Sequence, residues 1–178
     1  DREGYALTNF GASVGHIPVR IKVMNDPGSF LPVADAAHRE ATQSELDEIK
    51  AGVEQGLKRG ALAVGFGLDY TRGCSRWEAL ELFRIAAKYE ASCHVHLRGK
   101  GHKEPMSSIE AAGEVIAASA ITGAPLHIVH VQSTGMHATR QTLQMVAEAQ
   151  ARGLDVTTEC YPYMAGMTAI DSALFDEG

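Results

Sequence analysis

Two histidines, His96 and His130, lie near the ends of two apolar runs, SCHVHLR and PLHIVHVQ. Aligning the runs by their apolar cores pairs His96 with His130, and His94 with Ile128. Side chains two apart on a strand share a face, so we expect both imidazoles near the carboxyl ends of neighbouring strands. Zinc prefers neutral imidazole, and most catalytic zinc sites use three protein ligands. The spacing alone leaves two interpretations open, a metal site or a pair of core histidines.

The other histidines are expected to have structural or solvent-exposed roles. His94 shares a face with His96 but lies one layer deeper, and His127 has the opposite parity from His130, which predicts that it points toward the helices. An alternative treats His94 and His96 as a compact HxH metal site with His130 as third ligand. Four more histidines lie at predicted strand starts, loops or helix starts and show no metal-site motif in the sequence, namely His16, His38, His102 and His137.

Two tyrosines directly follow predicted strands, Tyr70 in GFGLDY and Tyr161 in ECYPY. At the same edge as the histidines, each would be able to donate a hydrogen bond to a substrate, or would pack at the strand end. The sequence contains no GxGxxG after a strand, no GxxxxGK[ST] and no GxSxG. Nucleotide-binding and serine-hydrolase interpretations therefore have no motif to support them.

Repeated strand-helix units must position these residues. The predicted strands are HIPVRIKVM, ALAVGFGL, SCHVHLR, PLHIVHVQ and LDVTTECYPY, and helices are expected at 42–59, from Ser75, at 107–122 and at 136–152. The later strands recur at intervals of roughly thirty residues, the size of a strand-helix unit in a parallel sheet. The predicted class is α/β. A full eight-unit barrel needs about 250 residues, so a barrel assignment would make this chain part of one.

Composition limits the function classes. The chain is 45% hydrophobic with a net charge of -6, which favours small-molecule partners over nucleic acid. Its apolar runs are shorter than the roughly 20 residues of a membrane span. Cys74, Cys93 and Cys160 form no CxxC pair, as is typical of a reducing compartment, so we expect a cytoplasmic protein.

Five motifs, in this order, resemble those of the N-acyl-D-amino-acid deacylases of the amidohydrolase superfamily. They are VGHIPVRIKVM, EQGLKRGALAVGFGLDYTRG, HVHLRGKG, PLHIVHVQSTG and GLDVTTECYPYMAG, and they span nearly the whole chain. The resemblance implies a TIM-like (β/α)8 metallo-dependent hydrolase barrel, of which residues 1–178 would be a partial domain without the remaining units and the small β domain. It also implies zinc-dependent hydrolysis of the amide bond of N-acyl-D-amino acids.

The resemblance assigns roles to individual residues. His96 and His130 match the metal-ligand histidines of the family, and Tyr70 and Tyr161 match tyrosines placed around the substrate. Arg98, two residues beyond the first ligand, is a candidate to hold the substrate carboxylate, because a planar guanidinium suits that group.

The departures from the family pattern concern substrate preference and completeness. Gln132 stands where such deacylases often have Lys, and Met167 stands where a small hydroxyl residue is common. The family's first HxH pair, its bridging ligand and its general-base Asp match no position here, so we expect an incomplete site. The alternative is a truncated, non-catalytic α/β domain that binds a small ligand or another chain. An incomplete barrel would expose apolar strand edges and tend to self-associate, and self-association without metal would favour this alternative.

Overall fold

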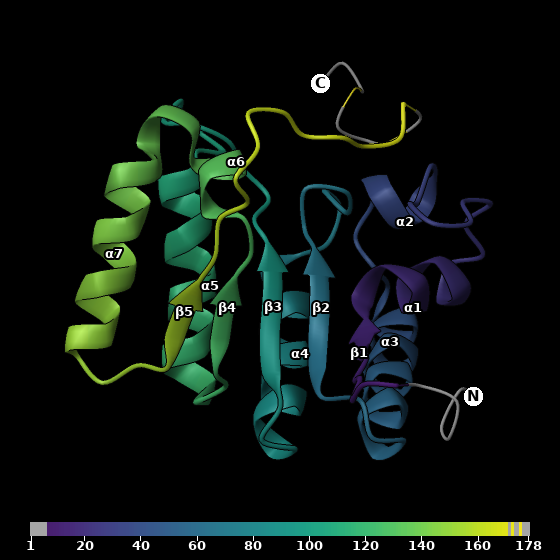
Figure 1. The fold of residues 1–178 in the computed structure, drawn as a ribbon. Helices are drawn as coiled ribbons and strands as arrows, with labels where there is room; N and C mark the ends of the chain where they lie inside the picture. Colours follow the sequence, from purple (N-terminus) through teal and green to yellow (C-terminus); the bar gives the residue numbers. More distant parts are fainter. Residues whose placement is uncertain (1–6, 171, 173–174, 176–178) are drawn as a thin grey trace.

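A computed structural model describes residues 7–170, 172 and 175 of the chain. Five parallel strands form one sheet in chain order (Figure 1), namely β1 (Ser13–Gly15), β2 (Ala63–Gly67), β3 (Ser92–His96), β4 (Leu126–Ile128) and β5 (Val156–Thr158). All four neighbouring strand pairs are parallel. The predicted α/β class with repeated strand-helix units is confirmed. In the described part of the chain the sheet is open, with β1 and β5 at its edges.

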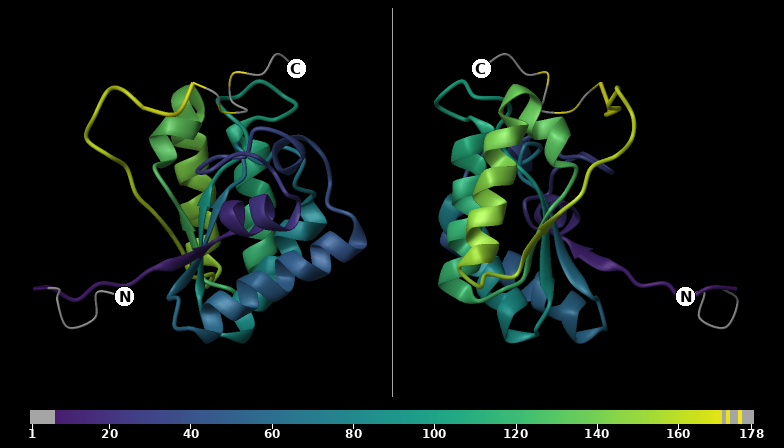
Figure 2. Two further views of the ribbon diagram at one scale, coloured as in Figure 1. Left: turned by 90° about the vertical axis from the view of Figure 1, so that its right-hand side faces the viewer. Right: turned by 60° about the vertical axis from the view of Figure 1, so that its left-hand side comes forward.

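Helices alternate with the strands along the chain. They are α1 (His16–Val23), α2 (Asp35–His38), α3 (Gln43–Lys58), α4 (Arg76–Lys88), α5 (Ser108–Thr122), α6 (Val131–Gly135), the 3₁₀ helix η1 (Met136–Ala138) and α7 (Thr139–Ala151). The long helices α3, α4, α5 and α7 pack side by side in that order on one side of the curved sheet (Figure 2). The described residues contain no helix long and apolar enough to cross a bilayer.

The predicted starts of α3, α4 and α5 are confirmed, and each of these helices has a side-chain cap, whereas α7 begins at Thr139 after the 3₁₀ helix η1 and has none. At α3, Thr42 Oγ1 accepts the backbone N–H of Glu45, and the Glu45 carboxylate accepts the backbone N–H of Thr42 at 2.8 Å. This reciprocal pair is a capping box. Ser75 caps α4 and Ser107 caps α5 through their hydroxyl oxygens. The caps set where each helix begins after the loop that follows a strand.

The prediction of a first strand at HIPVRIKVM is wrong. The segment HIPVRIKV forms helix α1, and the strand β1 lies just before it. Pro18 falls in the first helical turn, where its missing N–H has no intrahelical partner to lose. The helix brings His16 and Arg20, four residues apart, to one face. Both are fully buried and both contact the Glu78 carboxylate of α4, with His16 Nε2 at 2.7 Å from Oε1.

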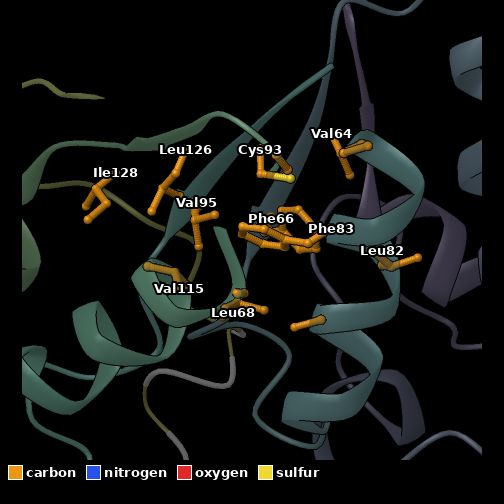
Figure 3. Close-up of a cluster of buried hydrophobic side chains, with 14 of the residues drawn as sticks. Val64, Phe66, Leu68, Leu82, Phe83, Cys93, Val95, Val115, Leu126 and Ile128 are labelled. Atoms are coloured by element: carbon orange, nitrogen blue, oxygen red, sulfur yellow. The ribbon is translucent and has the colours of Figure 1, made fainter. Parts of the chain in front are cut away.

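The core lies between the sheet and the helices (Figure 3). Phe66 of β2 packs on Phe83 of α4, with ring centroids 5.4 Å apart. In β3, Cys93 and Val95 are fully buried on this side. Because strand side chains alternate, the remaining β3 residues, His96 among them, project from the opposite face of the sheet. The buried core therefore fixes the strand that carries the first candidate ligand.

Candidate metal centre

The structure brings His96 and His130 together at the carboxyl ends of β3 and β4. His96 is the last residue of β3, and His130 follows β4 by two residues. Nδ1 of His96 lies 3.0 Å from Nε2 of His130, and the rings meet edge-on with centroids 4.6 Å apart. One nitrogen of each ring thus converges on the same point, at the edge of the sheet where α/β enzymes bind ligands.

The strand register that brings the two histidines together differs from the predicted register. The sheet pairs His94 with His127 and Val95 with Ile128, so the alignment of the two runs is wrong by one residue. Strand β4 ends at Ile128, and His130 then adopts a left-handed backbone with φ 34° and ψ 56°. Strand alternation no longer applies there, and this uncommon conformation lets the ring meet His96.

The corrected register also corrects the orientation of His127. Its ring lies beside His94 on the face away from the core, with centroids 4.9 Å apart, and does not point toward the helices. Its Nδ1 is 2.8 Å from Thr157 Oγ1, and its Nε2 is 3.6 Å from the Glu159 carboxylate. His94 instead contacts Ser92 at 3.0 Å. The compact HxH alternative places His94 at a strand end, whereas the structure places it in mid-strand.

The histidine pair fits two ligands of a zinc ion. Two nitrogens at roughly 2.0–2.1 Å from a tetrahedral zinc are about 3.4 Å apart, close to the 3.0 Å seen here. Burial, then the neighbouring His130 and Lys100, lowers the pKa of His96 to about 4, so the ring is neutral at pH 7, as zinc requires. Among the described residues, no third His, Cys, Asp or Glu has a ligand atom within 4.8 Å of both.

Asp69 is a site residue that the sequence analysis missed. It follows β2, is 3% exposed, and places Oδ2 4.0 Å from His96 Nε2 and 3.3 Å from Lys100 Nζ. Burial raises the pKa of this carboxyl, and the charge of Lys100 opposes that effect. Its position beside Tyr70 at the end of a strand was the available signal, because the same edge holds the histidines.

Both predicted tyrosines lie beside the histidine pair. The Tyr70 ring is 5.0 Å from that of His96, and the Tyr161 ring is 6.1 Å from that of His130, measured between centroids. The backbone carbonyl of Tyr161 accepts a hydrogen bond from Gln132 Nε2 at 3.2 Å. The two rings therefore flank the pair from β2 and from the segment after β5, while their contact with a substrate stays a prediction.

Arg98 is not brought to the histidine pair. Its Nε and Nη2 donate to the two carboxylate oxygens of Glu114 on α5, each at 2.9 Å, and its Nη1 donates to the Cys74 carbonyl at 2.9 Å. The residue is only 5% exposed. A substrate carboxylate would have to displace Glu114 to use this guanidinium. The substrate role of Arg98 stays a prediction, and these contacts favour a structural role.

A second cluster of potential metal ligands is a buried structural network. The ligand atoms of His16, Cys74 and Glu78 lie within 4.8 Å of one another, and all three residues are buried. The Glu78 carboxylate already pairs with Arg20 and His16. Burial raises the pKa of the Cys74 thiol, so it stays protonated at neutral pH. The cluster thus offers a cation no unbalanced negative charge.

The fold and the site together define an α/β protein built from barrel-type strand-helix units, with imidazole, carboxylate and phenol groups at the carboxyl ends of its strands. Over most of its length the chain is similar to deacylases of the amidohydrolase type. It is 27% identical over 170 residues to the N-acyl-D-glutamate deacylase of Alcaligenes xylosoxydans xylosoxydans, covering 92% of this chain. It is 26% identical to the D-aminoacylase of the same organism, covering 93% of this chain.

Solved structures agree with this similarity. A zinc- and phosphonate-bound N-acyl-D-glutamate deacylase from Bordetella bronchiseptica matches 90% of this chain and 32% of its own, with a TM-score of 0.71 and 23% identity. A D-aminoacylase matches 76% of this chain and 28% of its own, with a TM-score of 0.63 and 25% identity. No protein-family model matches the chain. The chain spans about a third of the length of the two curated relatives, and the resemblance predicted from the motifs is confirmed.

Proposed function

We propose that this chain contributes the two-histidine half of a zinc site in a hydrolase that cleaves the amide bond of N-acyl-D-amino acids. The observation that carries the proposal is the convergence of His96 Nδ1 and His130 Nε2 at 3.0 Å. The similarity to an N-acyl-D-glutamate deacylase and a D-aminoacylase supports the substrate class. The further metal ligands and the general-base Asp would come from outside residues 1–178.

Individual residues of the chain would have separate roles in this hydrolysis. His96 and His130 would hold zinc, which when bound polarises the amide carbonyl and lowers the pKa of water. Tyr161, beside His130, would donate a hydrogen bond to the developing oxyanion. Tyr70, beside His96, would orient the substrate. Gln132 carries no charge, so any charged recognition of the substrate in this region must come from other residues.

Zinc content measured by elemental analysis tests the proposal. With only two of the ligands present, the purified chain should bind zinc weakly after equilibration with excess zinc, and a His96→Ala, His130→Ala double variant should bind less. His127→Ala is the matched control, because it removes an imidazole from the same sheet but not from the pair, and its zinc content should stay unchanged. Equal zinc in the wild type and the double variant would contradict the proposal. Hydrolysis of N-acyl-D-amino acids by residues 1–178 alone should be negligible.

The second candidate is a non-catalytic α/β domain that binds a small ligand or another chain. The unpaired edges at β1 and β5 and the missing third ligand in the described part of the chain favour it. Self-association through these edges in metal-free sedimentation runs, together with absent zinc, would support this candidate over the hydrolase.

We also propose a cytoplasmic location. The three cysteines are free, which supports this proposal, namely Cys74, Cys93 and Cys160.

A further inference from the structure

The carboxylate of Asp69 faces the nitrogen of His96 that is turned away from His130. Asp69 Oδ2 lies 4.0 Å from His96 Nε2, whereas His96 Nδ1 points at His130. Both residues are largely enclosed, with side-chain exposures of 4% for Asp69 and 15% for His96. Among the described residues, His96 Nε2 has no hydrogen-bond partner. This buried nitrogen therefore faces a carboxylate oxygen whose other charged neighbour is the ammonium of Lys100, 3.3 Å away.

This arrangement influences which ring nitrogen of His96 carries the proton. A neutral imidazole has one N–H and one lone pair, and a metal takes the lone pair. If the proton of His96 is on Nε2, the N–H points toward a carboxylate and Nδ1 is free for a metal. If the proton is on Nδ1, a lone pair faces the carboxylate and the ring has no lone pair toward His130. In the first tautomer the Nε2–H of His130 donates to His96 Nδ1 across the 3.0 Å contact, and in the second the direction is reversed. Asp69 therefore favours the first tautomer electrostatically.

Lys100 holds the carboxylate in this position. Its Nζ lies 3.3 Å from Asp69 Oδ2, and its side chain is 44% exposed, so the ammonium approaches from the solvent side. Each of these side chains therefore lies beside the next, in the order Lys100, Asp69, His96, His130. Asp69 follows β2, the neighbour of the β3 strand that carries His96. A small side-chain movement would bring its Oδ2, which lies 4.0 Å from His96 Nε2, within hydrogen-bond distance.

We propose that Asp69 is a positioning residue that keeps the His96 proton on Nε2 and so presents the Nδ1 lone pair toward His130 and a bound metal. The metal part of this inference rests on the proposed function, whereas the tautomer is a property of the chain alone. Carboxylates that fix the tautomer of ligand histidines are a general device of metal sites, and their loss lowers metal affinity by roughly 10–100-fold.

Nitrogen-15 NMR of the labelled chain without metal at neutral pH reads the tautomer directly, with the His96 signals assigned by their loss in His96→Gln. The wild type should be mainly in the Nε2–H form. Asp69→Asn, which keeps the shape and removes the charge, should raise the population of the Nδ1–H form several-fold. Glu159→Gln makes the same change beside a different histidine, His127, whose Nε2 is 3.6 Å from the Glu159 carboxylate. It is the matched control, and the His96 tautomer should stay in the Nε2–H form.

Zinc dissociation constants from chelator competition complete the test. They should rise by roughly 10–100-fold in Asp69→Asn. A wild type in the Nδ1–H form would overturn the inference without any variant, as would an unchanged tautomer in a folded Asp69→Asn chain. Zinc binding with an unchanged tautomer would overturn the role of Asp69 and leave the proposed function standing. A shifted tautomer with no zinc bound by the wild type would support the role of Asp69 and contradict the proposed function.

Discussion

The contacts of Arg98 predict that it and Glu114 act as a structural unit. Their side chains are 6% and 8% exposed, and two hydrogen bonds of 2.9 Å join them. Removing one partner of a buried ion pair leaves the other charge uncompensated and costs about 3–5 kcal/mol. Arg98→Met and Glu114→Gln should each lower the free energy of unfolding by this amount. The double variant should lose much less than the sum, because neither charge is then left alone.

Urea unfolding followed by circular dichroism measures these losses. With an m-value of about 2 kcal/mol/M, each single variant should shift the midpoint down by about 1.5–2.5 M. Arg76→Met is the control, because Arg76 also approaches Glu114, at 3.6 Å, but is 58% exposed, and exposed pairs contribute about 0–1 kcal/mol. A loss below about 1 kcal/mol in Glu114→Gln would refute the reasoning and return Arg98 to the substrate role predicted from its sequence position.

Two further predictions concern the loop between α1 and α2 and the start of α3. The Asp26 carboxylate accepts four backbone N–H groups; burial alone would raise its pKa, but these bonds lower it below the usual 3.8. Because the pKa of Asp26 is lower in the folded than in the unfolded chain, its carboxylate stabilises the fold above the unfolded-state pKa, and this contribution is lost as the pH falls. Asp26→Asn should therefore lower the free energy of unfolding by about 2 kcal/mol near pH 7 and by progressively less below pH 4, as measured by urea titrations. A pH-independent difference would contradict this. Thr42→Ala should cost about 1 kcal/mol through loss of the capping box, and an unchanged thermal midpoint would contradict that.

The sequence by itself determined the features that depend on neighbours along the chain. The starts of α3, α4 and α5 follow from hydroxyl caps at Thr42, Ser75 and Ser107, whose partners are three residues away. The apolar runs that became β2 and β3 were recognisable because they are short, buried and bounded by polar loops. The two histidines and two tyrosines were placed at the correct edge, since the carboxyl ends of parallel strands meet there.

Tertiary structure decided what depends on distant partners. HIPVRIKV alternates like a strand, yet it forms a helix in which His16 and Arg20 meet Glu78, 62 and 58 residues away. The β3–β4 register and the left-handed backbone of His130 place that ring beside His96, 34 residues away. Helix caps and apolar runs depend on residues a few positions apart, so the sequence predicts them. Strand register, buried charge pairs and the contact of Asp69 with His96 depend on which distant segments pack together, and residue spacing does not predict this packing.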